Sequence, residues 1–189
     1  AEFILKLAAK FARQNANKRG IWRTGSDGLE RCPKKVTQWG LQKAAESAPR
    51  VSWSASGYAR GLRSFILDRV TAIHAVEFSV YKKGYGFAGT ADALLDIDGD
   101  GPFIVDWKTA KEVRSDDMIE QFCHQLGAYS IGLESLTGIK PKYGAVVVAR
   151  RSGKPQIKLL NSLELSGAKY DFLNRVEVYN KQLKKLAVV

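Results

Sequence analysis

Two strand-like runs joined by a tight turn constrain the fold of this 189-residue chain more than any other feature. Residues 87–97 (FAGTADALLDI) and 103–109 (FIVDWKT) are rich in apolar, aromatic and β-branched residues, which is typical of strands. The segment between them, 98–102 (DGDGP), has the glycines and the proline of a reverse turn. The sequence therefore predicts a β-hairpin that places these two strands side by side.

The predicted hairpin carries three charged residues on neighbouring strands. Asp92 lies on the first strand, and Asp106 and Lys108 lie on the second. Because side chains alternate along a strand, Lys108 shares a face with Asp106, and we expect all three side chains to converge at one end of the sheet. Charged residues rarely end apolar core strands. The combination therefore favours a functional site over a solvated surface.

Two carboxylates and an ammonium suit the metal-dependent hydrolysis of phosphodiesters. Asp92 and Asp106 offer the hard oxygen ligands that Mg²⁺ or Mn²⁺ prefers, and the backbone carbonyl of Trp107 offers another. Such an ion polarises a phosphoryl group and lowers the pKa of a bound water. Lys108 would orient the attacking water and neutralise developing charge. Asp92, Asp106 and Lys108 are therefore the predicted catalytic residues.

The rest of the pattern predicts a single α/β domain with a mixed central sheet flanked by helices. Residues 1–35 are expected to form an N-terminal helix (2–18) and a basic loop (19–33), and residues 36–189 the core. Helices are predicted over 36–48, 51–70, 116–137 and 166–186, and further strands over 75–81, 143–149 and 156–160. In the last helix, Tyr170, Leu173, Val176 and Leu183 are expected to face the sheet.

The chain is strongly basic, with 30 Lys and Arg against 19 Asp and Glu, and a formal net charge of +11. Counterion release drives such proteins onto nucleic acids, so DNA is the expected partner. The two cysteines, Cys32 and Cys123, suggest neither a disulfide framework nor a four-cysteine iron–sulfur cluster, which fits an intracellular protein. No apolar run suggests a membrane span, and the oligomeric state is left open.

Three ordered motifs resemble the PD-(D/E)xK nuclease superfamily, specifically its RecB-like exonucleases. They are G-T-A-D at 89–92, I-V-D-W-K-T at 104–109, and Gln125 with Tyr129 four residues later on one face of a predicted helix. The resemblance implies a restriction-endonuclease-like core, and a site in which the carboxylates of the first two motifs hold Mg²⁺ or Mn²⁺. It also implies that Gln125 and Tyr129 lie near the metal and the DNA backbone.

The resemblance is incomplete on the upstream helix. Members of the family usually carry a His there, in a G-x-x-x-H-x-x-x-E pattern, where it joins the metal shell. The predicted helix 36–48 has Gln42 where that His would stand and Glu46 at the Glu of the pattern, so both are candidate supporting residues. His74 is too close to the first aspartate to replace the missing His and is expected to be structural or on the surface. His124 is expected to point elsewhere.

The predicted function is a divalent-metal-dependent DNA exonuclease that acts on single strands or free ends, because the nearest resemblances are end-processing enzymes. A structure-specific endonuclease or resolvase is the alternative, since the same three residues serve both. A non-catalytic DNA-binding module with a degenerate site is another, because Gln42 replaces the usual His. Residues 96–101 (DIDGDG) also resemble the start of an EF-hand calcium loop, but the twelfth position of that loop is Trp107 and flanking helices are not predicted.

Overall fold

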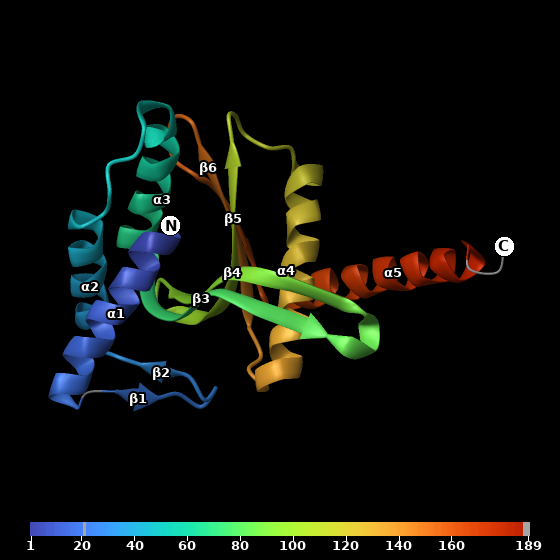
Figure 1. Cartoon of the computed structure of the whole chain (residues 1–189), viewed down its shortest axis with the longest axis horizontal. Helices are drawn as coiled ribbons and strands as arrows, with labels where there is room; N and C mark the ends of the chain where they lie inside the picture. The colour runs from blue at the N-terminus through green and yellow to red at the C-terminus, as the bar shows by residue number, and fades with distance from the viewer. Residues whose placement is uncertain (21, 187–189) are drawn as a thin grey trace.

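A five-stranded sheet lies between two layers of helices in the computed structural model, which describes residues 1–20 and 22–186 (Figure 1). The strand order is β3-β4-β5-β6-β7, and every neighbouring pair is antiparallel except β5 and β6, which are parallel. The predicted α/β class with a mixed, restriction-endonuclease-like sheet is therefore confirmed. The strands are β3 (Val70–Lys82), β4 (Phe87–Ile97), β5 (Asp100–Ala110), β6 (Tyr143–Arg150) and β7 (Gln156–Leu160).

Helices cover both faces of this sheet (Figure 1). Three of them, on the left in Figure 1, lie on one face, and two lie on the other. None of the helices in the described part of the chain has the length and apolar character needed to cross a membrane. The first three are α1 (Glu2–Arg19), α2 (Lys34–Glu46) and α3 (Ser56–Arg69), and the others are α4 (Asp116–Thr137) and α5 (Ser162–Leu186).

The two central strands are buried on both faces. Ile104 and Val146 pack into the core under α4 and α5, whereas Val105 and Val147 pack into the core under α1, α2 and α3. Strands covered on both sides read as continuous apolar runs, which explains the composition of β6. A parallel pair also needs a long crossover, and α4 provides it between β5 and β6.

The β4–β5 hairpin closes with a two-residue turn at Asp98 and Gly99. Their φ angles are 55° and 97°, and Ile97 pairs with Asp100 on either side of them. Two positive φ values in succession characterise a type I′ turn, for which Asp-Gly is a preferred sequence. The turn is therefore shorter than the predicted 98–102, and β5 begins at Asp100 instead of residue 103.

Several predicted boundaries were wrong. The predicted loop 19–33 contains a small two-stranded ribbon formed by β1 (Arg23–Thr24) and β2 (Glu30–Arg31), while residue 21 lies outside the described residues. A 3-10 turn, η1 (Trp53–Ala55), precedes α3, so the predicted helix 51–70 is shorter. The strand predicted over 75–81 is β3, and it begins at residue 70 because residues 70–73 already pair with β4.

The last helix faces the sheet over only part of its length. Tyr170 and Leu183 were predicted to face the sheet, but they are 67% and 45% exposed. Figure 1 shows the reason, since α5 extends beyond the body of the domain. Its contact with the rest of the chain includes Phe172, whose ring lies 4.9 Å from that of Phe87 at the start of β4.

A partly buried ion network attaches the β1–β2 ribbon to the central sheet. Arg31 Nε donates to Asp96 Oδ2 at 2.5 Å, and its terminal nitrogens bind both carboxylate oxygens of Asp27 at 2.8 and 2.9 Å. His74 Nε2 lies 2.9 Å from Asp96 Oδ1. Burial alone would raise the pKa of Asp96, but hydrogen bonds from His74 and Arg31 hold this pKa below its ordinary value. Asp96 is therefore a buried, ionised structural group.

Replacing Arg31 by alanine should lower the free energy of unfolding by about 2 to 4 kcal/mol, because Asp96 would stay buried without its main counter-charge. Urea unfolding followed by circular dichroism would measure the change. Arg23→Ala is the matched control, since Arg23 is an exposed arginine of the same ribbon, paired in register with Arg31. Equal midpoints for the two variants would contradict the structural role of the network.

Candidate active site

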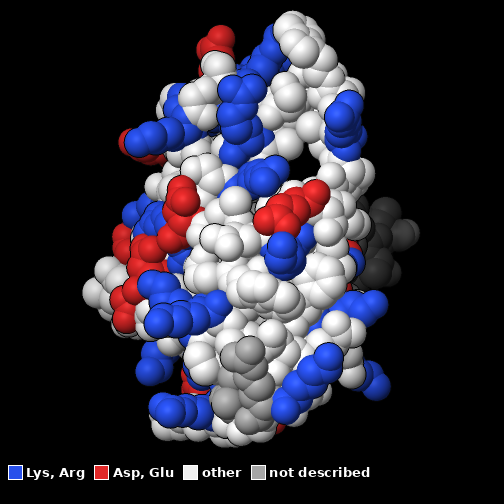
Figure 2. All heavy atoms as spheres, turned by 90° about the vertical axis from the view of Figure 1, so that its left-hand side faces the viewer, with Lys and Arg blue, Asp and Glu red and all other residues white. Residues whose placement is uncertain are grey.

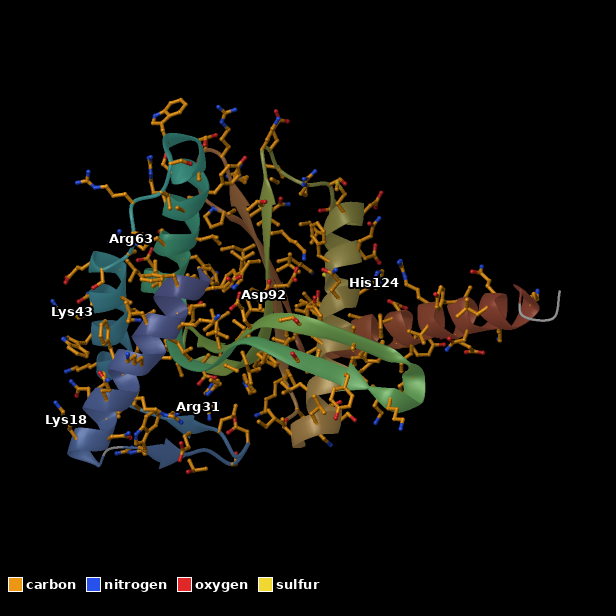
Figure 3. All side chains as sticks on the ribbon, viewed as in Figure 1. Lys18, Arg31, Lys43, Arg63, Asp92 and His124 are labelled. Carbon is orange, nitrogen blue, oxygen red and sulfur yellow. The ribbon has the colours of Figure 1, made fainter. Side chains whose placement is uncertain are left out.

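The two strands of the predicted hairpin bring Asp92 and Asp106 side by side. Ala93 pairs with Val105, and the same register extended by one residue sets Asp92 beside Asp106. The β4–β5 ladder ends at this point, and the N–H of Trp107 donates to Asp92 Oδ2 at 2.7 Å instead of to a strand carbonyl. Asp92 therefore fixes the place where β4 leaves β5, near the centre of the molecule in Figure 3.

Both strands of the β3–β4 pair bend at Asp92. Ala91 packs into the core under α4, but Ala93 packs into the core on the other face, although residues two apart in a regular strand share a face. Val76 and Phe78 of β3 change faces in the same way, and Glu77 between them has a φ of 49°. The bend turns the outer half of the β3–β4 hairpin away from β5 (Figure 1).

Glu77 lies at the bend of β3 and was not predicted to have any special role. Val76 pairs with Ala93, and this register sets Glu77 across from Asp92. A left-handed φ is rare and costly for a residue other than glycine, and such strain collects at functional sites. The carboxylate of Glu77 forms an ion pair with Lys6 of α1. The one signal in the sequence was an acidic residue within the apolar run AVEFSVY.

Lys108 lies against Asp106 on β5, the central strand of the sheet. Its Nζ is 2.9 Å from Oδ1 and 2.7 Å from Oδ2, and it donates its hydrogen bond to Oδ1. The side chain of Asp106 is 2% exposed and that of Lys108 is 25% exposed. The same Nζ lies 5.2 Å from the ring centroid of Phe122 on α4, a cation–π distance. Lys108 therefore reaches the solvent between Asp106 and α4.

Burial raises the pKa values of both carboxylates. That of Asp106 rises to about 6, because burial and the charge of Asp92 outweigh the nearby Lys108. Burial also raises the pKa of Asp92, and the charge of Glu2 at the start of α1 contributes in the same direction. Two acidic groups that repel each other in a buried site gain from a cation placed between them.

The donor atoms of this site fit a divalent metal ion. Asp106 Oδ2 is buried and accepts no hydrogen bond from the described residues, although it forms an ion pair with Lys108 at 2.7 Å, so it keeps lone pairs that could bind a cation. Asp92, Asp106 and the Trp107 carbonyl are the hard oxygen donors that Mg²⁺ and Mn²⁺ prefer. Within residues 1–20 and 22–186, no group of three or more His, Cys, Asp or Glu side chains is arranged to hold a metal. A site with two carboxylates suits Mg²⁺, which keeps several waters.

Helix α4 faces the carboxylates with the residues of the third motif. The ring of Tyr129 packs on Gly89, where an added Cβ would lie 3.1 Å from Tyr129 Cε1. Burial and then the charges of Asp106 and Asp92 raise the pKa of the Tyr129 phenol, so this side chain lies close to both carboxylates. Gln125 is exposed, and it lies on the same side of α4 as Tyr129 and as Phe122, which Lys108 contacts.

The structure does not bring Gln42 and Glu46 to the carboxylates. Gly40 packs α2 closely onto α1, since an added Cβ would lie 2.8 Å from the Ala8 carbonyl oxygen. Because a helix turns about 100° per residue, Gln42 and Glu46 point to the opposite side of α2. Both are exposed, and Glu46 pairs with Lys43 at 2.9 Å. Figure 3 shows Lys43 at the outer edge of the molecule.

The remaining candidates lie outside the site. Figure 3 shows His124 on the side of α4 turned away from Asp92, and its Nε2 is 3.9 Å from Asp171. Two of the three acidic residues of the calcium-loop alternative are already paired, because Asp96 binds His74 and Arg31 while Asp98 binds Arg69 at 2.5 Å. The segment 96–101 is a hairpin turn without helices on either side, so it lacks the geometry of an EF-hand.

Together, the bent mixed sheet and the Asp–Asp–Lys cluster at its centre define a nuclease-type α/β domain. The sequence model of the PD-(D/E)XK nuclease superfamily matches residues 5–183, and the chain belongs to this superfamily, which confirms the resemblance at that level. Its members are nucleases that generally use divalent metal ions such as Mg²⁺. A search of curated proteins gave no significant sequence match.

Proposed function

We propose that this chain is a divalent-metal-dependent DNA exonuclease that acts on single strands or free ends, with Mg²⁺ or Mn²⁺ as cofactor. The observation that carries the proposal is the buried carboxylate of Asp106, which lies beside Asp92 and has the ammonium of Lys108 against both of its oxygens. Because one ammonium faces two neighbouring carboxylates in a buried site, and the pKa of Asp106 stays raised in spite of it, a further cation would stabilise their ionised forms.

In this proposal Asp92, Asp106 and the Trp107 carbonyl would hold the ion. The bound ion supplies Lewis-acid chemistry, polarising the phosphoryl group and lowering the pKa of a water. Lys108 lies at the solvent side of Asp106, where it would orient the attacking water and stabilise charge that develops on the phosphorus oxygens. Gln125 and Tyr129 would position the DNA backbone from α4, and this helix supports a place among the RecB-like members of the superfamily.

The surface charge supports DNA as the substrate. Figure 2 shows that Lys and Arg side chains predominate on the face formed by the first helices of the chain. Phosphate contacts by such residues supply affinity without reading the base sequence. Exposed basic residues from α1 to α3 include Lys10, Arg13, Lys34, Lys35, Lys43, Arg50, Arg60 and Arg63.

The free thiols of Cys32 and Cys123 support an intracellular setting for the protein.

Linear and circular single-stranded DNA of the same sequence would test the need for an end. We expect Mg²⁺-dependent loss of the linear strand to be at least about tenfold faster than cutting of the circle, and no cutting of either in EDTA. Gel analysis of end-labelled and internally labelled strands would measure both rates. Cutting of the circle at the rate of the linear strand would indicate an endonuclease instead of an exonuclease. Binding without cutting under any metal condition would indicate a non-catalytic module.

A further inference from the structure

An exposed tryptophan lies beside a basic pocket at one end of α3. Trp53 is 86% exposed, more than any other large hydrophobic side chain in the described part of the chain. It lines a cavity of about 300 Å³, here called the Trp53 pocket, together with Arg60, Arg151 and neighbouring serines and glycines. The pocket lies between the first turn of α3 and the turn that joins β6 to β7, at the top of Figure 1.

The backbone on both sides of the Trp53 pocket is held in place. Ser56 Oγ donates to the Trp53 carbonyl oxygen at 2.7 Å. Gly57 packs directly on the backbone of Arg151, so closely that an added Cβ would lie 1.7 Å from the Arg151 carbonyl oxygen. Trp53 therefore presents the face of a large aromatic ring to solvent from a firmly packed backbone, which is the geometry on which an unpaired base can stack.

The charge of the Trp53 pocket selects a polyanion. Arg60 and Arg151 are exposed, and neither forms an ion pair with another described residue. None of the described residues that line the pocket is acidic. A second cavity of about 400 Å³ shares Ser56 and Arg60 with it, and adds Arg50 and Arg63. Arginine beside an exposed aromatic face is the combination with which proteins hold single-stranded nucleic acid.

The Trp53 pocket also lies at the end of the strand that carries Asp106 and Lys108. The N–H of Arg151 donates to the Ala110 carbonyl oxygen at 3.3 Å, and Arg150 pairs with Ala110 in the β5–β6 register. Ala110 is two residues beyond Lys108, about 7 Å along the strand. Lys108 lies on the face of the sheet covered by α4, and α3 covers the other face, so a nucleic acid strand that follows β5 outward from the carboxylates would reach this pocket around the end of β5.

We propose that the Trp53 pocket binds an unpaired nucleotide of the substrate strand, with the base stacked on Trp53 and the flanking phosphates on Arg60 and Arg151. The inference rests on the proposed nuclease function and adds to it a binding site for the unpaired strand, because a base inside a duplex cannot stack on a protein side chain. It makes single-stranded DNA, or a frayed end, the preferred substrate.

Binding in EDTA, where a metal-dependent enzyme cannot cut, tests the pocket. Fluorescence anisotropy would give the Kd of a labelled oligothymidylate and of a labelled blunt duplex for each variant. Trp53→Ala should weaken oligothymidylate binding on the order of tenfold and leave duplex binding within about twofold. Trp53→Phe should restore most of the loss because it keeps a ring. Tyr170→Ala is the control, since Tyr170 is a 67% exposed aromatic on α5.

The possible outcomes distinguish a failure of the proposed Trp53 pocket from a failure of the proposed nuclease function. An unchanged oligothymidylate Kd in Trp53→Ala, or an equal loss for strand and duplex, would overturn base stacking at Trp53. If the wild type also cuts DNA and Lys108→Ala does not, the nuclease would stand without the pocket. Weaker oligothymidylate binding by Trp53→Ala alone, in a protein that cuts no DNA, would support the pocket and refute the nuclease.

Discussion

Replacing Lys108 by alanine should lower the rate of Mg²⁺-dependent DNA cleavage by on the order of 10²-fold or more. Lys108 Nζ contacts both oxygens of Asp106, whose side chain is 2% exposed, so its charge acts in a region of low effective dielectric. Alanine removes the group that orients the water and offsets developing charge, but it leaves both carboxylates in place. Single-turnover cleavage of end-labelled single-stranded DNA would measure the rate, and anisotropy in EDTA would measure the affinity.

The affinity of Lys108→Ala for DNA should stay within about threefold of the wild type, because one of many phosphate contacts adds little to a basic surface. Lys111→Ala is the matched control, since Lys111 is an exposed lysine three residues further along the chain. It should leave the cleavage rate unchanged. If Lys108→Ala cleaves DNA at the rate of Lys111→Ala, Lys108 takes no part in the reaction. If Lys108→Ala loses DNA binding together with cleavage, Lys108 acts mainly as a DNA contact.

The parts of the fold that could be predicted from the sequence depend on local signals. The glycines after Ile97 predict a reverse turn, although it is confined to Asp98 and Gly99 instead of the predicted 98–102, and the apolar run of β6 predicts a strand buried on both faces. The helix predicted over 116–137 has those bounds in the structure, since Ser115 precedes it and Gly138 ends it with a φ of 75°. Such local signals are sufficient to predict that Asp92 and Asp106 lie on adjacent strands.

The parts that could not be predicted depend on tertiary packing. The bend at Asp92 requires a left-handed φ at Glu77, and no residue near Glu77 in the sequence signals it. The orientation of α2 depends on its contact with α1 at Gly40, which turns Gln42 and Glu46 toward the solvent. The sequence pattern could align these two residues with a family motif, but it could not show which side of the helix packs. The acidic helix residue whose charge raises the pKa of Asp92 is Glu2 of α1, and not Glu46 of α2.

Asp106→Asn should abolish Mg²⁺-dependent cleavage and, in EDTA at pH 8, raise the thermal stability of the protein. The pKa of Asp106 is raised to about 6 by burial, from an ordinary value of 3.8, so the folded protein binds this proton more tightly than the unfolded chain. Ionisation of Asp106 therefore destabilises the metal-free fold, by a free energy on the order of 3 kcal/mol. Asparagine keeps the shape of the side chain and removes the charge.

The pH dependence identifies the cause of this stabilisation. Since the destabilisation by the Asp106 charge develops between about pH 4 and about pH 6, the advantage of Asp106→Asn should be full above pH 6 and vanish near pH 4. Mg²⁺ should raise the melting temperature of the wild type at pH 8 but not that of the variant, because binding to the folded state alone stabilises it. Asp100→Asn, at an exposed position of the same strand, is the control and should change neither property. A melting temperature for Asp106→Asn below that of the wild type in EDTA at pH 8 would show that the carboxylate stabilises the metal-free fold through Lys108, and that the buried charge is no reason for a cation to bind there.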